Sequence, residues 1–126
     1  DENGRVISMD YSGNTIPLFP NRLANARLTC SFSFADASLH LQHVGNQYLD
    51  NTENNDRALD PYTLLNLRLD SQLTFLGFQS IGLSLQLNNV LNEKYIPSGY
   101  YDAWSGYNYY FPAATRNYFI ELTTKL

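Results

Sequence analysis

The sequence predicts an all-β fold, an antiparallel up-and-down meander of about five long strands that forms part of a transmembrane β-barrel. Apolar and polar residues alternate along five separate segments, and a period of two residues is typical of strands. Each segment holds roughly ten to thirteen residues, close to the ~9–11 residues of a tilted membrane-spanning strand. The connections are alternately short and long, as they are in barrels of the outer membrane.

The first expected strand runs from Arg22 to about Phe34, because Ala, Leu, Cys and Phe at even positions alternate with Asn, Arg, Thr and Ser. A short turn at Ala35–Asp36 is expected to lead into a second strand, from about Ala37 to Tyr48, where leucines alternate with Ser, His and Gln. The segment from Leu49 to Asp60 predicts a loop, because it is rich in the Asn and Asp residues that favour turns.

The third expected strand runs from Tyr62 to about Leu73 and alternates Leu with Asn, Arg and Asp. A short stretch from Thr74 to Ser80, which contains Gly77, is expected to turn the chain into a fourth strand from Ile81 to about Leu91. The longest loop follows, from about Asn92 to Ala114. The segment from Val6 to Tyr11 is a candidate for one additional strand.

The fifth expected strand spans Thr115 to Leu126 and alternates to the last residue of the sequence. Its apolar face consists of Tyr118, Ile120, Leu122 and Leu126, with Thr124 between the last two. Outer-membrane barrels end in a strand of this kind, because the last strand must pair with the first to close the barrel. We therefore expect these residues to belong to a closing strand.

Apart from Arg22 and Arg116 near the starts of their segments, the apolar positions of the five segments contain no Asp, Glu, Lys or Arg, whereas the alternate positions contain several. A charge-free face suits lipid, and a polar face suits a water-filled lumen. A soluble sandwich also alternates, so periodicity alone leaves both environments open. The pattern predicts one face with Leu28, Leu41, Leu67, Leu85 and Ile120, and an opposite face with Arg27, Gln42, Arg68, Gln86 and Glu121.

The sequence indicates neither an enzyme nor a nucleic-acid-binding protein. The formal net charge is −4, whereas a nucleic-acid partner requires a basic surface. The motifs G-x-S-x-G, H-E-x-x-H and C-x-x-C do not occur. His40 and His43 are three residues apart, so a strand places them on opposite faces. The acidic segment Asp50–Asp56 departs from the EF-hand pattern and is expected to be a solvated loop. We therefore expect no metal and no cofactor.

The longest loop is rich in aromatic residues between Tyr95 and Phe111. Such rings can stack on a sugar or on a flat chelator and also donate hydrogen bonds. They can equally form a girdle at the membrane interface or pack within a projecting hairpin. Trp104 is the first candidate for ligand contact because it lies in the middle of the loop. The candidate ligand-binding residues are Trp104, Tyr100, Tyr101 and Tyr107, and the candidate girdle residues are Tyr95 and Tyr110.

Five segments of the chain resemble five short sequence patterns of one protein family, and they occur in the same order as in that family. Leu87-Asn-Asn-Val-Leu-Asn-Glu-Lys-Tyr95 is the most specific and resembles a V-x-N-L-F/L-N-x-x-Y segment. With the other four, it resembles the C-terminal end of a TonB-dependent outer-membrane receptor. Leu126 departs from the aromatic residue that usually ends this family, and Glu121 replaces a frequent Gly. The other four segments are Pro20–Asn25 (P-x-H/N-R-L-N), Val44–Asn51 (V-G-x-x-Y-x-D-N), Leu59–Tyr62, and Tyr110–Arg116 (Y-P-x-x-x-R).

The resemblance implies that residues 1–126 are the C-terminal portion of a barrel of about twenty-two strands that encloses a plug domain. Five strands do not close alone, since the smallest barrels have about eight. The implied whole protein lies in the bacterial outer membrane, contacts lipid, and imports a small extracellular ligand such as a siderophore, cobalamin or glycan. TonB would contact parts outside this chain. A soluble β-sandwich carbohydrate-binding module and a passive porin segment are the alternatives.

Overall fold

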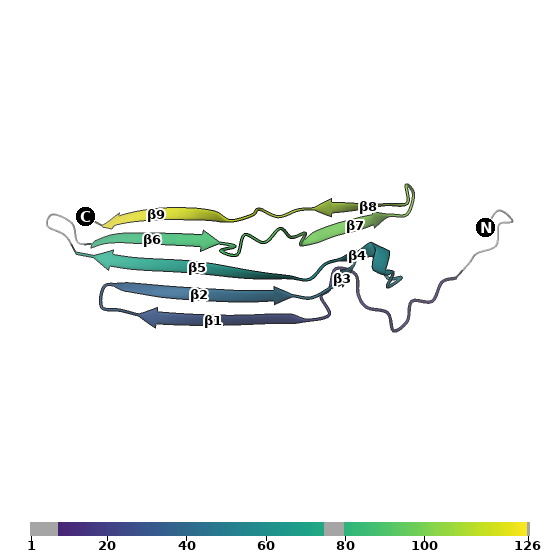
Figure 1. Cartoon of the computed structure of the whole chain (residues 1–126), viewed down its shortest axis with the longest axis horizontal. Coiled ribbons are helices and arrows are strands. Elements are labelled where there is room, and N and C mark those ends of the chain that lie inside the picture. Colours follow the sequence, from purple (N-terminus) through teal and green to yellow (C-terminus); the bar gives the residue numbers. More distant parts are fainter. Residues whose placement is uncertain (1–7, 75–79, 126) are drawn as a thin grey trace.

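A computed structural model describes residues 8–74 and 80–125, and these residues are all-β apart from one 3-10 turn, η1 (Asn55–Arg57). Five strands form one antiparallel sheet in the order β1-β2-β5-β6-β9, which is a meander (Figure 1). Within the described residues, the sheet is open, with β1 and β9 at its edges. No helix in this part of the chain has the length and apolar character to cross a membrane. The strands are β1 (Leu23–Ser31), β2 (Ala35–Val44), β5 (Tyr62–Leu73), β6 (Ser80–Asn88) and β9 (Asn117–Lys125).

Two small hairpins lie beyond one end of the sheet (Figure 1). One consists of β3 (Gln47–Tyr48) and β4 (Ala58–Leu59), and the other of β7 (Ser98–Asp102) and β8 (Tyr107–Phe111). The segment before β1 packs along the first hairpin, where the Leu18 amide donates to the Tyr48 carbonyl at 2.8 Å. We call this end of the sheet the loop end and the opposite end the turn end.

The first predicted turn is wrong by a few residues. Ala35 and Asp36 belong to β2, and Asp36 lies opposite Ser31 of β1. The turn is formed by residues 32–34 and is closed by a 2.8 Å bond from the Phe32 amide to the Ala35 carbonyl. The turn lies earlier than predicted because β1 and β2 stay paired as far as Ser31 and Asp36, which are both polar.

The second strand also ends earlier than predicted, at Val44 instead of Tyr48. Beyond Val44 the chain still lies beside the segment before β1, because the Gly45 amide donates to the Arg22 carbonyl at 2.8 Å and the Asn21 amide donates to the Asn46 carbonyl at 3.0 Å. A Cβ on Gly45 would lie 2.1 Å from the Asn21 side-chain oxygen and 3.1 Å from the Arg22 nitrogen. The Asn21 side chain could move aside, but the backbone of Arg22 lies closer than most Cβ contacts allow, so glycine fits best at this position.

The expected fourth strand ends three residues early, at Asn88, because Asn89 and Asn92 adopt left-handed φ angles of 51° and 57°. The predicted loop from Asn92 to Ala114 is wrong in its interior, which contains the β7–β8 hairpin. Tyr11 lies in no strand. Three further predictions lie outside the described residues, namely the turn around Gly77, Val6 as part of a strand, and Leu126 as the last residue of the closing strand.

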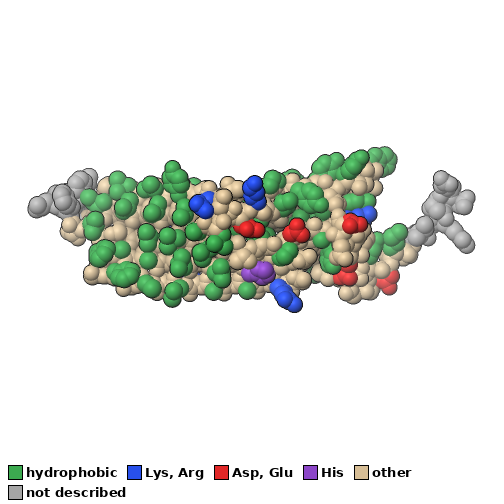
Figure 2. Space-filling model, viewed as in Figure 1, with side chains coloured by type: hydrophobic (Ala, Val, Ile, Leu, Met, Phe, Trp, Pro, Cys, Tyr) green, Lys and Arg blue, Asp and Glu red, His purple; other side chains and the backbone are tan. Residues whose placement is uncertain are grey.

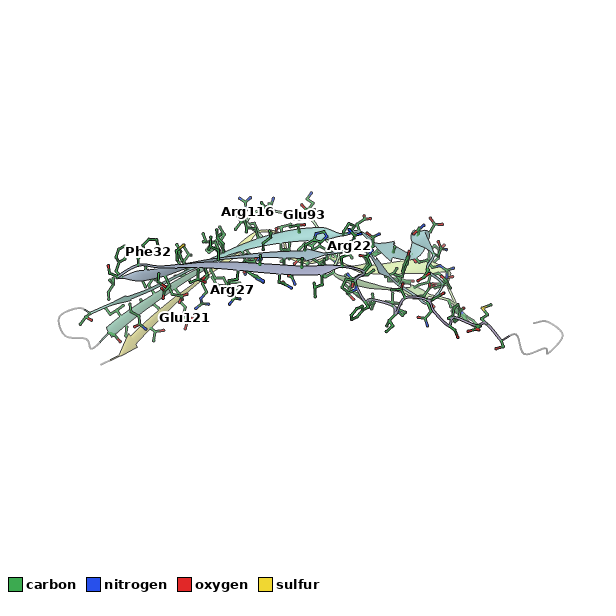
Figure 3. The ribbon with its side chains drawn as sticks, turned by 90° about the horizontal axis from the view of Figure 1, so that it is seen from below. Arg22, Arg27, Phe32, Glu93, Arg116 and Glu121 are labelled. Atoms are coloured by element: carbon green, nitrogen blue, oxygen red, sulfur yellow. The ribbon has the colours of Figure 1, made fainter. Side chains whose placement is uncertain are left out.

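The two predicted faces of the sheet are confirmed by the register. Leu28 lies opposite Leu39, Leu39 opposite Leu67, and Leu85 opposite Ile120, so one face is apolar across all five strands. The alternate positions form a polar face. Seen edge-on, the sheet bows, with Arg27 and Glu121 on the inner side and Phe32 on the outer side (Figure 3). His40 and His43 fall on opposite faces, as predicted, because they belong to β2 and differ in parity.

The apolar face is not covered by a second layer of the described residues. Ile120 is 66% exposed and Leu28 is 62% exposed, although both lie mid-strand. In Figure 2, hydrophobic side chains extend over the turn end of the visible face, and charged side chains gather toward the loop end. The small core lies at or near the loop end and consists of Val44, Leu49, Leu59 and Leu64.

The open edges predict self-association of the isolated chain. The outer edges of β1 and β9 carry backbone N–H and C=O groups that have no neighbouring strand among the described residues. We expect dimers or larger assemblies, because pairing with a second copy satisfies these groups. Sedimentation velocity without detergent measures the outcome. A monomer at high concentration would contradict this expectation.

Candidate functional site

The β7–β8 hairpin presents two chemically different faces. Tyr100 lies opposite Tyr109 and Tyr101 lies opposite Asn108 in its register. Because side chains alternate along each strand, these pairs point to opposite sides of the hairpin. We call the side with Tyr100, Tyr107, Tyr109 and Phe111 the aromatic face. The other side, with Gly99, Tyr101, Asn108 and Tyr110, is the anchored face.

The aromatic face is exposed and built from adjoining rings. The Tyr100 and Tyr109 rings stack with centroids 5.1 Å apart and an interplanar angle of 14°. The Phe111 centroid lies 6.1 Å from that of Tyr100. Tyr107 extends the face toward the tip of the hairpin and is 69% exposed. Contiguous exposed apolar surface of this kind is typical of an interaction site.

The anchored face packs against the loop that carries η1. The Arg57 guanidinium lies 3.5 Å from the centroid of the Tyr101 ring, which is a cation–π contact. Asp50 holds the same guanidinium through a 2.7 Å ion pair. The Asn108 side-chain nitrogen donates to the Asp56 carbonyl at 2.8 Å. The hairpin is therefore fixed to a neighbouring loop by one of its two faces.

Asp50 was expected in a solvated loop, but it organises this junction. Partial burial alone would raise the pKa of Asp50, but hydrogen bonds from Thr52 and Arg57 outweigh it and lower that pKa. The carboxylate therefore stays charged at neutral pH and can hold Arg57 over Tyr101. Sequence patterns did not identify this contact, because it joins residues of two separate loops.

Trp104 lies at the tip of the hairpin and is 98% exposed. Asp102 shapes the tip, where it accepts a 2.7 Å bond from the Ser105 hydroxyl and a 3.0 Å bond from the Trp104 amide. The bond from Ser105 is the main cause of the lowered pKa of Asp102. Gly106 closes the turn with φ +76°, a conformation that glycine favours. The indole is thus presented to solvent on an ordered turn.

The most specific motif of the sequence forms the base of this region. Asn89 is 3% exposed, and its side chain both accepts from the Glu93 amide at 2.9 Å and donates to the Glu93 carbonyl at 2.8 Å. The Asn66 side chain accepts a 2.9 Å bond from the Asn89 amide, which ties the motif to β5. The Tyr95 ring packs against the Tyr62 ring in a tilted arrangement, with centroids 4.5 Å apart and an interplanar angle of 38°. The motif therefore fixes where the aromatic segment leaves the sheet.

The structure divides the predicted ligand-binding residues. Tyr100 and Tyr107 lie on the aromatic face and Trp104 lies at the tip, whereas Tyr101 lies on the anchored face. Sequence reasoning did not select Tyr109 and Phe111, although alternation within residues 107–111 was a signal for a strand. Ligand contact by any of these residues stays a prediction. The described residues contain no group of three or more His, Cys, Asp or Glu side chains placed to hold a metal ion.

Comparisons with known proteins add no assignment. No protein-family model matches the chain, and no curated protein matches it significantly.

Gly99 makes the hairpin sensitive to one methyl group. A Cβ at this position would lie 2.5 Å from the Tyr109 carbonyl oxygen and 3.3 Å from a Leu49 methyl carbon. We expect Gly99→Ala to destabilise the hairpin locally by about 1–3 kcal/mol, because backbone must move to relieve the clash. Amide hydrogen exchange of residues 98–111 measures the effect.

Gly82→Ala in β6 is the matched control, since its Cβ would meet Thr123 at an ordinary 3.6 Å. In the Gly82→Ala chain, the amide hydrogen-exchange rates of residues 98–111 should equal those of the unchanged chain. If the Gly99→Ala chain also kept these rates, the close contact at Gly99 would not restrain the hairpin.

Proposed function

We propose that this chain forms wall and extracellular loops of a TonB-dependent outer-membrane receptor that imports a scarce nutrient. The main support is the uncovered apolar face of the sheet. Within the described strands this face carries no Asp, Glu, Lys or Arg, yet Ile120 and Leu28 are largely exposed. Lipid would remove this surface from water, whereas a soluble sandwich would require a second sheet across it.

The dimensions and polarity of the sheet agree with this proposal. Its strands hold 9, 10, 12, 9 and 9 residues, against the ~9–11 needed to cross a bilayer with tilt. Arg22, Glu93 and Arg116 lie on the outer side with Phe32, but all three lie outside the strands (Figure 3). Charges at the loop end would meet the polar boundary of the membrane.

The inner side of the bow carries hydrogen-bonded polar groups, as a wet lumen would allow. Arg68 forms two bonds with the Asp70 carboxylate, at 2.7 and 2.8 Å, and Ser84 donates to the same carboxylate. In the proposed receptor, the missing barrel strands would pair with the edges of β1 and β9. A plug domain, and the contact with TonB, would belong to parts of the protein outside this chain.

The aromatic hairpin would contact the extracellular ligand. It projects beyond the sheet at the end with the long connections, which would be the extracellular end of a barrel. Its anchored face holds the aromatic face in one position, and such preorganisation reduces the entropy lost on binding. A siderophore, cobalamin and a glycan all offer surfaces that stack on aromatic rings.

A charge on the apolar face tests the membrane environment. In the receptor that contains this chain, Leu85→Arg should lower folding stability in lipid by about 2–4 kcal/mol, the cost near the bilayer midplane. Ser84→Arg is the control, because Ser84 lies on the polar face opposite Asp70 and Glu121. Heat-modifiable migration in gels measures the folded fraction. Equal folding of both variants in lipid would exclude the membrane assignment.

Two aromatic substitutions separate ligand contact from packing. Trp104→Ala should weaken ligand binding while leaving the amount of assembled barrel unchanged, because the indole is almost fully exposed. Tyr95→Ala should lower assembly first, because it removes the ring that packs against Tyr62 of β5. Binding of radiolabelled nutrient to whole cells, normalised to the receptor in outer-membrane fractions, measures both. Lower abundance of the Trp104→Ala receptor with intact affinity would assign the indole a packing role instead.

A further inference from the structure

The polar face contains a hollow of about 380 Å³ that lies away from the aromatic hairpin. Four strands line it, with Arg27 from β1, His40 from β2, Asn66 and Arg68 from β5, and Gln86 from β6. The register brings these side chains together, since Arg27 lies opposite His40, His40 opposite Asn66, and Arg68 opposite Gln86. No Asp or Glu is among the described residues that line this hollow.

Hydrogen bonds around the hollow use the nearby acceptors and leave donors. Asp70 occupies the Nε and Nη2 groups of Arg68, and only Gln86 meets Nη1, at 3.5 Å. The Asn66 oxygen accepts from the Asn89 amide, which leaves the Asn66 side-chain nitrogen as a donor. Within the described part of the chain, Arg27 forms neither an ion pair nor a side-chain hydrogen bond. The hollow therefore offers N–H groups and the positive charge of Arg27, whereas Asp70 balances the charge of Arg68.

The arrangement of charges favours an anionic occupant. Arg27 and His40 lie directly opposite each other, so the guanidinium and the imidazole can both contact one occupant of the hollow. The charge of Arg68 is paired with Asp70, which leaves Arg27 as the cation available to an anion. Guanidinium groups bind the oxygens of phosphate in a bidentate manner, which a chloride ion cannot reproduce. The combination of two arginines, a histidine and an amide is complementary to a compact anion with several oxygens.

We propose that this hollow binds a phosphate group, with Arg27 as its main ligand and His40, Asn66 and the Nη1 group of Arg68 completing the site. The same chemistry serves free inorganic phosphate and the phosphate of an organic monoester. The proposal concerns the polar face alone, so it is independent of the aromatic hairpin and of the imported nutrient.

The test is isothermal titration calorimetry of the full chain, folded in detergent micelles, with inorganic phosphate and with glycerol 3-phosphate as separate probes. We expect saturable binding of at least one probe. Arg27→Gln should weaken it about tenfold or more, because a charged hydrogen-bond donor is lost. The affinity of the Arg27→Lys chain should lie between those of the unchanged chain and the Arg27→Gln chain, because lysine keeps the charge and loses the planar guanidinium.

Arg22→Gln is the matched control. It removes the same charge next to the same strand, but Arg22 lies on the opposite side of the sheet from Arg27 (Figure 3). Its affinity should stay within about twofold of the unchanged chain, and circular dichroism confirms that each variant keeps its β-structure. Tighter binding of glycerol 3-phosphate than of phosphate would assign the site to a larger ligand. Absence of binding for both probes, or equal affinity of the Arg27→Gln and Arg22→Gln chains, would overturn the proposal.

Discussion

The register of the backbone ladder is the constraint on which the rest of this structure depends. Because side chains alternate, a slip of one residue in any strand would move all its leucines to the polar face. Leu28, Leu39, Leu67 and Leu87 lie in one continuous row because three successive pairings agree. The two faces and the hollow beside Arg27 follow from that agreement.

Periodicity predicted the strands and their faces because it reports the environment of each side chain. The predicted and observed bounds agree for β5, whose alternation is regular and whose neighbouring strands carry the same kind of side chain on each face. It fails at strand ends, where single backbone positions decide. The assigned β2 ends just before Gly45, whose backbone closely approaches that of Arg22, and β6 ends just before Asn89, which has a left-handed φ. Alternation carries no information about such positions.

The candidate site was predictable only in part, for a related reason. The density of aromatic residues indicated the segment, but it could not assign Tyr100 and Tyr101 to different faces without the hairpin register. The contact of Arg57 with Tyr101 joins residues 44 positions apart (101 − 57) and depends on how two loops meet. Composition had suggested that the loop around Asp50 was simply solvated. Its carboxylate instead positions the cation that supports the hairpin.

The two ends of the sheet differ in how they are stabilised, and this difference bears on function. The small core lies at or near the loop end, where Leu59 is almost completely buried beside Leu49 and Val44. Among the described residues, the middle of the sheet has no such core, and its strands are held together by backbone pairing. Burial and aromatic contacts therefore concentrate toward the loop end, although loops are usually the most mobile parts of a protein. Under the proposed receptor function, an ordered loop end would present a fixed recognition surface on the extracellular side of the sheet.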